Sequence, residues 1–238
     1  FRSELRLFVR EPTAAFFTLA FPLMILVVFG TVFGNDPIPT EGGWGAIDLS
    51  AQGYVAMIIG TVTLLGIPVV ISSYRQYKIF RRMRATPLQP LTIIVAHTLV
   101  HLVSTALGLA ILLLGGSILF DLRMPENPLG VAIGALTGYL AFAAIGFLIG
   151  GVVGTSRTAQ VIGNVVYFPQ LFLAGAAMPR EMFSDSLRQW TAWLPMTQVV
   201  NAIKDPWKGD PVNLTSLVAL TVIGILAAAI ASRRFEWE

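Results

Sequence analysis

The sequence has no cysteine among its 238 residues. That absence excludes disulfides, thiol catalysis and thiolate metal sites. Charge is also scarce: Asp, Glu, Lys and Arg make up 12% of the chain, against the roughly 25% that is typical of soluble domains. Hydrophobic residues make up 55%. So little charge cannot cover a water-facing surface in the usual way, and the composition therefore predicts an integral membrane protein.

Several motifs of catalysis are absent as well. No Gly-xxxx-Gly-Lys-Ser/Thr loop is present, so the chain is predicted to have no ATPase of its own. No Gly-x-Ser-x-Gly motif occurs, and no acidic residue lies within an apolar run. His97 and His101 share a helix face at a spacing of four, but they lack the Glu of a zincin helix and a third ligand. We favour packing or pore-facing roles for them and predict neither a metal site nor catalytic residues. An intramembrane enzyme would need partners for these two histidines.

The sequence contains several long runs without charged residues. About 20 predominantly apolar residues cross the roughly 30 Å hydrocarbon core of a bilayer as a helix. Six such runs are present: 13–33, 51–73, 91–120, 128–155, 158–177 and 212–232. The spacing of Gly146, Gly150 and Gly154 is typical of close helix packing in membranes. We therefore predict an all-α integral membrane protein with six transmembrane helices, forming one domain over residues 1–238.

The distribution of Lys and Arg predicts the orientation. Cytosolic loops carry the excess of these residues. Eleven of the 16 lie at positions 2–10, 75–84, 157 and 233–234, whereas the first opposite loop, 34–50, has three acidic residues and no cation. With an even number of spans, this asymmetry places both termini in the cytosol.

Three segments outside the spans are patterned. Residues 1–12 read as an amphipathic helix lying in the membrane interface, with an ordinary basic flank as the alternative. Residues 178–211 suggest an outer amphipathic segment that dips back into the membrane, with Trp190, Trp193 and Trp207 at headgroup level. An apolar face at Phe183, Leu187, Trp190 and Leu194 predicts one helix there.

The third segment, 74–90, carries five cations, no acid and several apolar side chains. One interpretation is a basic loop that binds anionic lipid. The other is a short helix that docks into the groove of a soluble partner. Its composition alone leaves the two interpretations open.

Several short motifs, in order along nearly the whole chain, resemble the permease subunits of type-2 ABC exporters, the daunorubicin-resistance-like branch in particular. The match to the first helix of that family comes from residues 7–12, 21–22 and 29–34. Its cytosolic coupling segment resembles Arg-Arg-Met-Arg-Ala-Thr-Pro-Leu at 81–88, and its late signature resembles 171–175, Pro179 and 194–197. The chain departs from the family pattern at 76–78, where Glu and Gly are common, and at Ala174, where Ser is common.

The resemblance implies a mechanism and its residues. Two permease chains, expected to form a homodimer, would bind two cytosolic ATPase subunits, and ATP and magnesium would bind to those subunits and not to this chain. The coupling residues would be Arg75, Lys78, Phe80, Arg81, Arg82, Met83, Arg84 and Pro87. The substrate path would lie near the dimer interface, along Tyr54, Met57 and Thr61 of the second span and Asn164, Tyr167, Phe168 and Leu171 of the fifth. Simple helix packing is the alternative role for these seven residues.

The implied function is export of hydrophobic or amphiphilic compounds, such as a drug or a lipid-like molecule, across a bacterial or archaeal plasma membrane. No nucleic-acid partner is expected. The alternative is an ion-coupled secondary transporter or channel. Such proteins commonly carry ionisable residues inside their spans, and the six runs contain no Asp, Glu, Lys or Arg.

Overall fold

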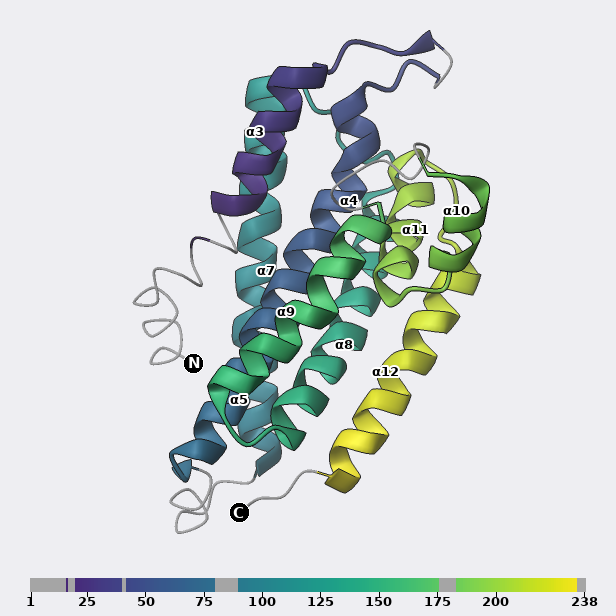
Figure 1. The fold of residues 1–238 in the computed structure, drawn as a ribbon. Helices are drawn as coiled ribbons and strands as arrows, with labels where there is room; N and C mark the ends of the chain where they lie inside the picture. The colour runs from purple at the N-terminus through teal and green to yellow at the C-terminus, as the bar shows by residue number, and fades with distance from the viewer. Residues whose placement is uncertain (1–15, 17–19, 40–41, 80–89, 176–182, 235–238) are drawn as a thin grey trace.

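The computed structural model describes residues 16, 20–39, 42–79, 90–175 and 183–234 as a bundle of helices (Figure 1). Within these ranges every regular element is helical. The elements are α3 (Phe21–Phe33), α4 (Ala46–Gly60), the π-helical segment η3 (Thr61–Gly66), α5 (Ile67–Gln76), α7 (Pro90–Phe120), α8 (Pro128–Val152), α9 (Ser156–Leu173), α10 (Asp185–Thr191), α11 (Pro195–Trp207) and α12 (Leu214–Arg234). The all-α prediction is confirmed for the described part of the chain.

Four of the described helices are long and apolar enough to cross a membrane: 46–76, 94–120, 128–152 and 214–233. They correspond to the second, third, fourth and sixth predicted runs. The first run is represented by the 13 residues of α3. The fifth is represented by α9, which has 18 residues but includes Arg157, Gln160 and Asn164 and is therefore less apolar. The predicted interfacial helix at 1–12 lies outside the described residues.

The helix formed by α4, η3 and α5 is the centre of the bundle. Its side chains are largely buried, including Tyr54, Met57, Ile58 and Leu64. Helix α8 approaches it closely: a Cβ added at Gly150 would lie 2.8 Å from the Cβ of Ile71. Small residues let helix backbones come together, and such packing holds helices together in lipid, where no hydrophobic driving force acts between them.

The loops gather at two opposite ends of the bundle (Figure 1). The loop between α3 and α4, the loop between α7 and α8, and the pair α10 and α11 lie at one end. The ends of α5 and α12 and the short turn between α8 and α9 lie at the other end. The cations Arg75, Lys78, Arg157 and Arg233 belong to the segments at the second of these ends, which is the side predicted to carry the excess of Lys and Arg. We refer to the first of these ends, with α10 and α11, as the loop end and to the second, with the turn between α8 and α9, as the turn end.

The segment after α9 contains two described helices, so the prediction of one amphipathic helix through Leu194 is wrong. α10 stops at Thr191, and α11 begins at Pro195, because proline fits the first helical turn, where its missing N–H has no partner to lose. Trp190 is 84% exposed and Trp193 75% exposed, and their place at headgroup level stays a prediction. Trp207 is 1% exposed and lies in the core, which corrects its predicted place in the headgroup region.

Candidate functional site

The end of α5 is fastened to the end of α8 by Arg75. Its guanidinium Nη1 donates hydrogen bonds to the carbonyl oxygens of Gly151 and Val153, at 3.3 Å for Val153. The last carbonyls of a helix have no partner within it, and the helix dipole makes that end favourable for a cation. Arg75 thus caps α8 from a neighbouring helix. The resemblance implied that this side chain contacts a partner ATPase, but its Nη1 donors bind within the chain.

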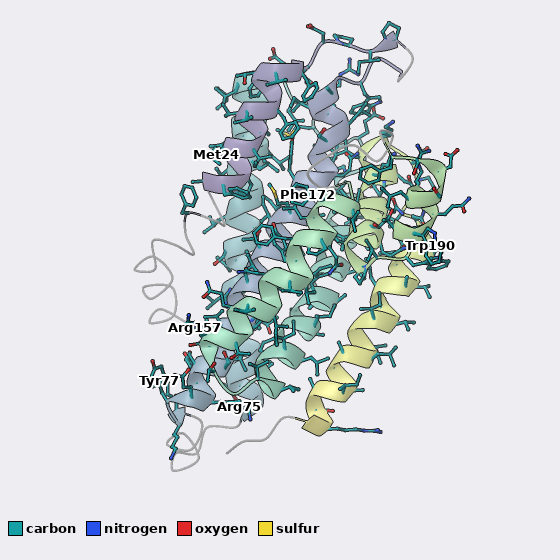
Figure 2. All side chains as sticks on the ribbon, viewed as in Figure 1. Met24, Arg75, Tyr77, Arg157, Phe172 and Trp190 are labelled. Carbon is teal, nitrogen blue, oxygen red and sulfur yellow. The ribbon has the colours of Figure 1, made fainter. Side chains whose placement is uncertain are left out.

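The next residue holds the beginning of α9. The Gln76 side-chain oxygen accepts hydrogen bonds from the backbone N–H of Ser156, at 3.1 Å, and from its hydroxyl, at 3.3 Å. Ser156 is the first residue of α9, and Thr155 caps that helix by accepting from the N–H of Thr158. We call Arg75, Gln76 and the turn residues 151–156 the α5 clip; Figure 2 labels Arg75 at this end of the bundle.

The predicted coupling segment continues directly from the clip. Tyr77 is 63% exposed, and Lys78 is exposed with a φ of 53°, so the chain turns sharply away from the helix there. Figure 2 shows Tyr77 directed away from the bundle. The remaining predicted coupling residues lie outside the described residues: Phe80, Arg81, Arg82, Met83, Arg84 and Pro87.

Five of the seven predicted pathway residues are buried within the chain: Tyr54, Met57, Thr61, Tyr167 and Leu171. The hydroxyls of Thr61 and Tyr167 lie 2.8 Å apart, and the Thr61 hydroxyl donates to the carbonyl of Met57 at 2.8 Å. In this conformation the hydroxyls of Thr61 and Tyr167 and the backbone carbonyl of Met57 form a closed contact between the central helix and α9. Their role as a path stays a prediction.

The other two pathway residues belong to the outward face of α9. Asn164 is half-buried and Phe168 is exposed. Gln160, Val165 and Phe172 are exposed on the same helix. Figure 2 shows Arg157 near the beginning of α9 and Phe172 near its end, so this face runs along the bundle. It mixes amide and apolar side chains, whereas an outward face that meets only lipid carries few polar groups.

The two histidines of α7 are packed within the bundle. His97 and His101 are both buried, their rings lie 6.3 Å apart, and Tyr74 lies edge-on to His97 at 5.1 Å. The Cε1 atom of His101 faces Gly66 at the end of η3. Among the described residues, no group of three His, Cys, Asp or Glu side chains could hold a metal ion. This geometry is that of the packing role.

A network at the loop end was missed by sequence reasoning. Asp48 is 2% exposed and accepts hydrogen bonds from the N–H of Gly45 at 3.0 Å, from the N–H of Arg123 at 2.9 Å and from the amide of Asn35 at 3.1 Å. Asn35 also donates to the carbonyl of Phe120 at 3.0 Å. These bonds join the ends of α3 and α7 to the beginning of α4. The position of Asp48 three residues after Gly45, the N-cap of α4, was the available signal, because an acidic side chain there can accept from the backbone N–H of the N-cap.

Comparison with known protein families identifies the class of the chain. The family model described as ABC-2 type transporter, which covers the membrane domain, matches residues 1–205. The chain belongs to the ABC-2 type transporter family. No curated protein matches it.

An ABC-2 permease is the membrane component of an ATP-driven transporter and works with ATPase subunits. The chain is therefore a permease and not itself the ATPase. In such a permease the energy of ATP reaches the membrane helices only through contacts with the ATPase. The geometry of the α5 clip matters for that reason, since it joins three helices next to the segment that resembles the coupling region.

Proposed function

We propose that this permease belongs to the daunorubicin-resistance-like branch and exports hydrophobic or amphiphilic compounds as a homodimer. The observation that carries this proposal is the outward face of α9. A second copy covers that face, and the substrate passes beside it.

The composition of the face supports both parts of the proposal. Gln160 and Asn164 carry amides that are costly to expose to lipid, and amides commonly form hydrogen bonds across helix interfaces. Phe168 and Phe172 on the same helix offer aromatic surface. A wall of aromatic groups with a few amides suits ligands that have both an apolar body and a polar group.

The proposed topology has six spans: α3, the helix 46–76, α7, α8, α9 and α12. The turn end faces the cytosol and carries the basic loops, as the distribution of Lys and Arg requires. Both termini are then cytosolic, in a bacterial or archaeal plasma membrane. The coupling residues Lys78, Phe80, Arg81, Arg82, Met83, Arg84 and Pro87 meet the separate ATPase, which binds ATP and magnesium, whereas Arg75 binds the end of α8.

The test is co-purification of the tagged permease from its native membranes in mild detergent. We expect an ATPase subunit to accompany it and ATP hydrolysis to rise on adding an amphiphilic rhodamine dye but not a hydrophilic sugar. The double variant R82D/M83D should lose the ATPase while still inserting in the membrane. Met124→Asp is the matched control, because Met124 is exposed at the loop end, and it should retain the ATPase.

Two results would overturn the proposal. A permease that transports the dye without an ATPase, and stops when the proton gradient collapses, is a secondary transporter. An ATPase that stays bound to R82D/M83D as firmly as to the Met124→Asp control does not dock on the coupling segment.

A further inference from the structure

Three helices meet at the turn end, and the α5 clip is the point where they are joined. α5 ends at Gln76, α8 ends at Val152 and α9 begins at Ser156. The hydrogen bonds of Arg75 reach the end of α8, and those of Gln76 reach the beginning of α9. Two consecutive residues therefore bind both sides of one short turn.

The packing above the clip holds these helices in close contact. Gly150 lies against Ile71 and Pro68 of α5, and the backbone of Gly163 in α9 lies against the carbonyl of Leu64. Contacts this close leave no room for one helix to slide past another. A displacement of the end of α5 is therefore transmitted to the beginning of α9 rather than absorbed between them.

We propose that Arg75 is a positioning residue of the transport cycle, which ties the coupling segment to α9 through the turn between α8 and α9. The segment that begins at Tyr77 pulls on the end of α5 when the ATPase subunits close, and the clip carries that movement to the helix whose outward face lines the path. Gln76 acts with Arg75 as the weaker second contact, because its bonds to Ser156 are exposed.

This inference rests on the proposed function only in requiring an ATPase that docks next to α5. The clip role of Arg75 differs from a docking role in one respect. A docking residue contributes to the affinity for the ATPase, whereas a clip residue contributes to the movement of α9 after the ATPase has bound nucleotide.

The experiment follows α9 directly with a single thiol. The chain has no cysteine, so Gln160→Cys introduces one reporter on the outward face of α9 near the clip, and its reactivity measures how open that face is to solvent beside the second copy. Its rate of reaction with N-ethylmaleimide is measured in the purified complex with the co-purifying ATPase, without nucleotide and after trapping with ATP and vanadate. The difference between the two rates is normalised to the amount of ATPase bound.

Two variants break the clip from opposite sides. Arg75→Met removes the donors to α8 and keeps an unbranched side chain. Ser156→Pro removes the N–H and the hydroxyl that bind Gln76, and proline is accepted there because Ser156 is the first helical residue and Thr155 before it is extended. Arg157→Met is the matched control: it removes an exposed cation from the same turn and leaves the clip intact.

We expect Arg75→Met to reduce the nucleotide-dependent difference at least about fivefold, the lower range of coupling between distant sites. Ser156→Pro should reduce it about twofold, as an exposed contact does. The double variant Arg75→Met/Ser156→Pro should reduce the nucleotide-dependent difference no further than Arg75→Met alone, because both substitutions act on one connection. Arg157→Met should leave it unchanged.

The proposal is overturned if Arg75→Met lowers the amount of bound ATPase while the normalised response persists, since Arg75 is then a docking residue. It is also overturned if Arg157→Met matches Arg75→Met, since surface charge at this end is then what matters. Failure of any ATPase to co-purify would contradict the proposed function itself and is seen before a variant is made.

Discussion

The substitution Asp48→Asn should destabilise the permease by an amount that its hydrogen bonds determine. The carboxylate is almost fully buried and accepts three N–H donors, from Gly45, Arg123 and Asn35. An asparagine side chain offers one acceptor oxygen, so it can retain the two donors on Oδ1 and must present its own N–H₂ to the N–H of Gly45. One charge-assisted bond is lost and two donors face each other.

Bonds to charged groups contribute about 1.5–3 kcal/mol, and an unsatisfied buried donor costs about 1–3 kcal/mol. We therefore expect Asp48→Asn to lower the free energy of unfolding by about 2.5–6 kcal/mol, the sum of these two terms. The matched control is Asp36→Asn, which removes an exposed carboxylate from the same loop and should change the free energy by less than about 0.5 kcal/mol. The measurement is SDS titration in mixed micelles, followed by tryptophan fluorescence.

The result that would refute this reasoning is equality of the two variants. If Asp48→Asn unfolds at the same SDS fraction as Asp36→Asn, the network does not hold the ends of α3, α4 and α7 together. A third variant, Asp48→Ala, sharpens the comparison. It loses all three bonds, so it should be less stable than Asp48→Asn, and an Asp48→Ala that is more stable would point to an unfavourable buried charge.

Two further predictions follow from the packing and the topology. Gly150→Val should destabilise the protein by about 1–3 kcal/mol, because its Cβ would overlap Ile71. Gly154→Ala should have no measurable effect, because nothing lies within 4 Å of its Cβ position, and the same SDS titration compares the two variants. Thiols placed singly at the exposed positions Asp36 and Lys78 should differ in labelling by a membrane-impermeant maleimide, the first reacting in intact cells and the second only after permeabilisation, and the reverse pattern would invert the topology.

The spans were predictable because lipid imposes one local requirement on every stretch of chain that crosses it. The predicted run 91–120 became α7 at Pro90–Phe120, and the run 128–155 became α8 at Pro128–Val152. Charge-free length is readable without knowing any neighbour. The close packing expected of Gly146 and Gly150 followed from the same kind of pattern, and Gly154 departed from it because the helix ends before that residue.

The contacts that organise the two ends were not predictable from local pattern. Arg75 lies among five cations of one basic segment, and nothing in its neighbourhood distinguishes it as the one that binds carbonyls about 76 positions later. Asp48 is one of three acidic residues in its loop, and it is buried in the network whereas Asp36 is exposed. Trp207 resembled the other tryptophans of its segment until the fold of α11 placed it inside. Each outcome depends on a partner from a distant part of the sequence.

The contacts at the two ends of the bundle are related because both hold the same helix, 46–76. Asp48 fixes the beginning of α4 to α3 and α7, and Arg75 fixes the end of α5 to α8 and α9. Between them lies η3, where the hydrogen bonds follow the wider π-helical pattern, and π-helical segments within longer helices frequently occur at functional sites. This helix is therefore joined to different neighbours at its two ends, with an irregular segment between them. Thr61, which bonds to Tyr167 of α9, lies at the start of that segment, so α9 contacts the same helix both at the clip and near its middle.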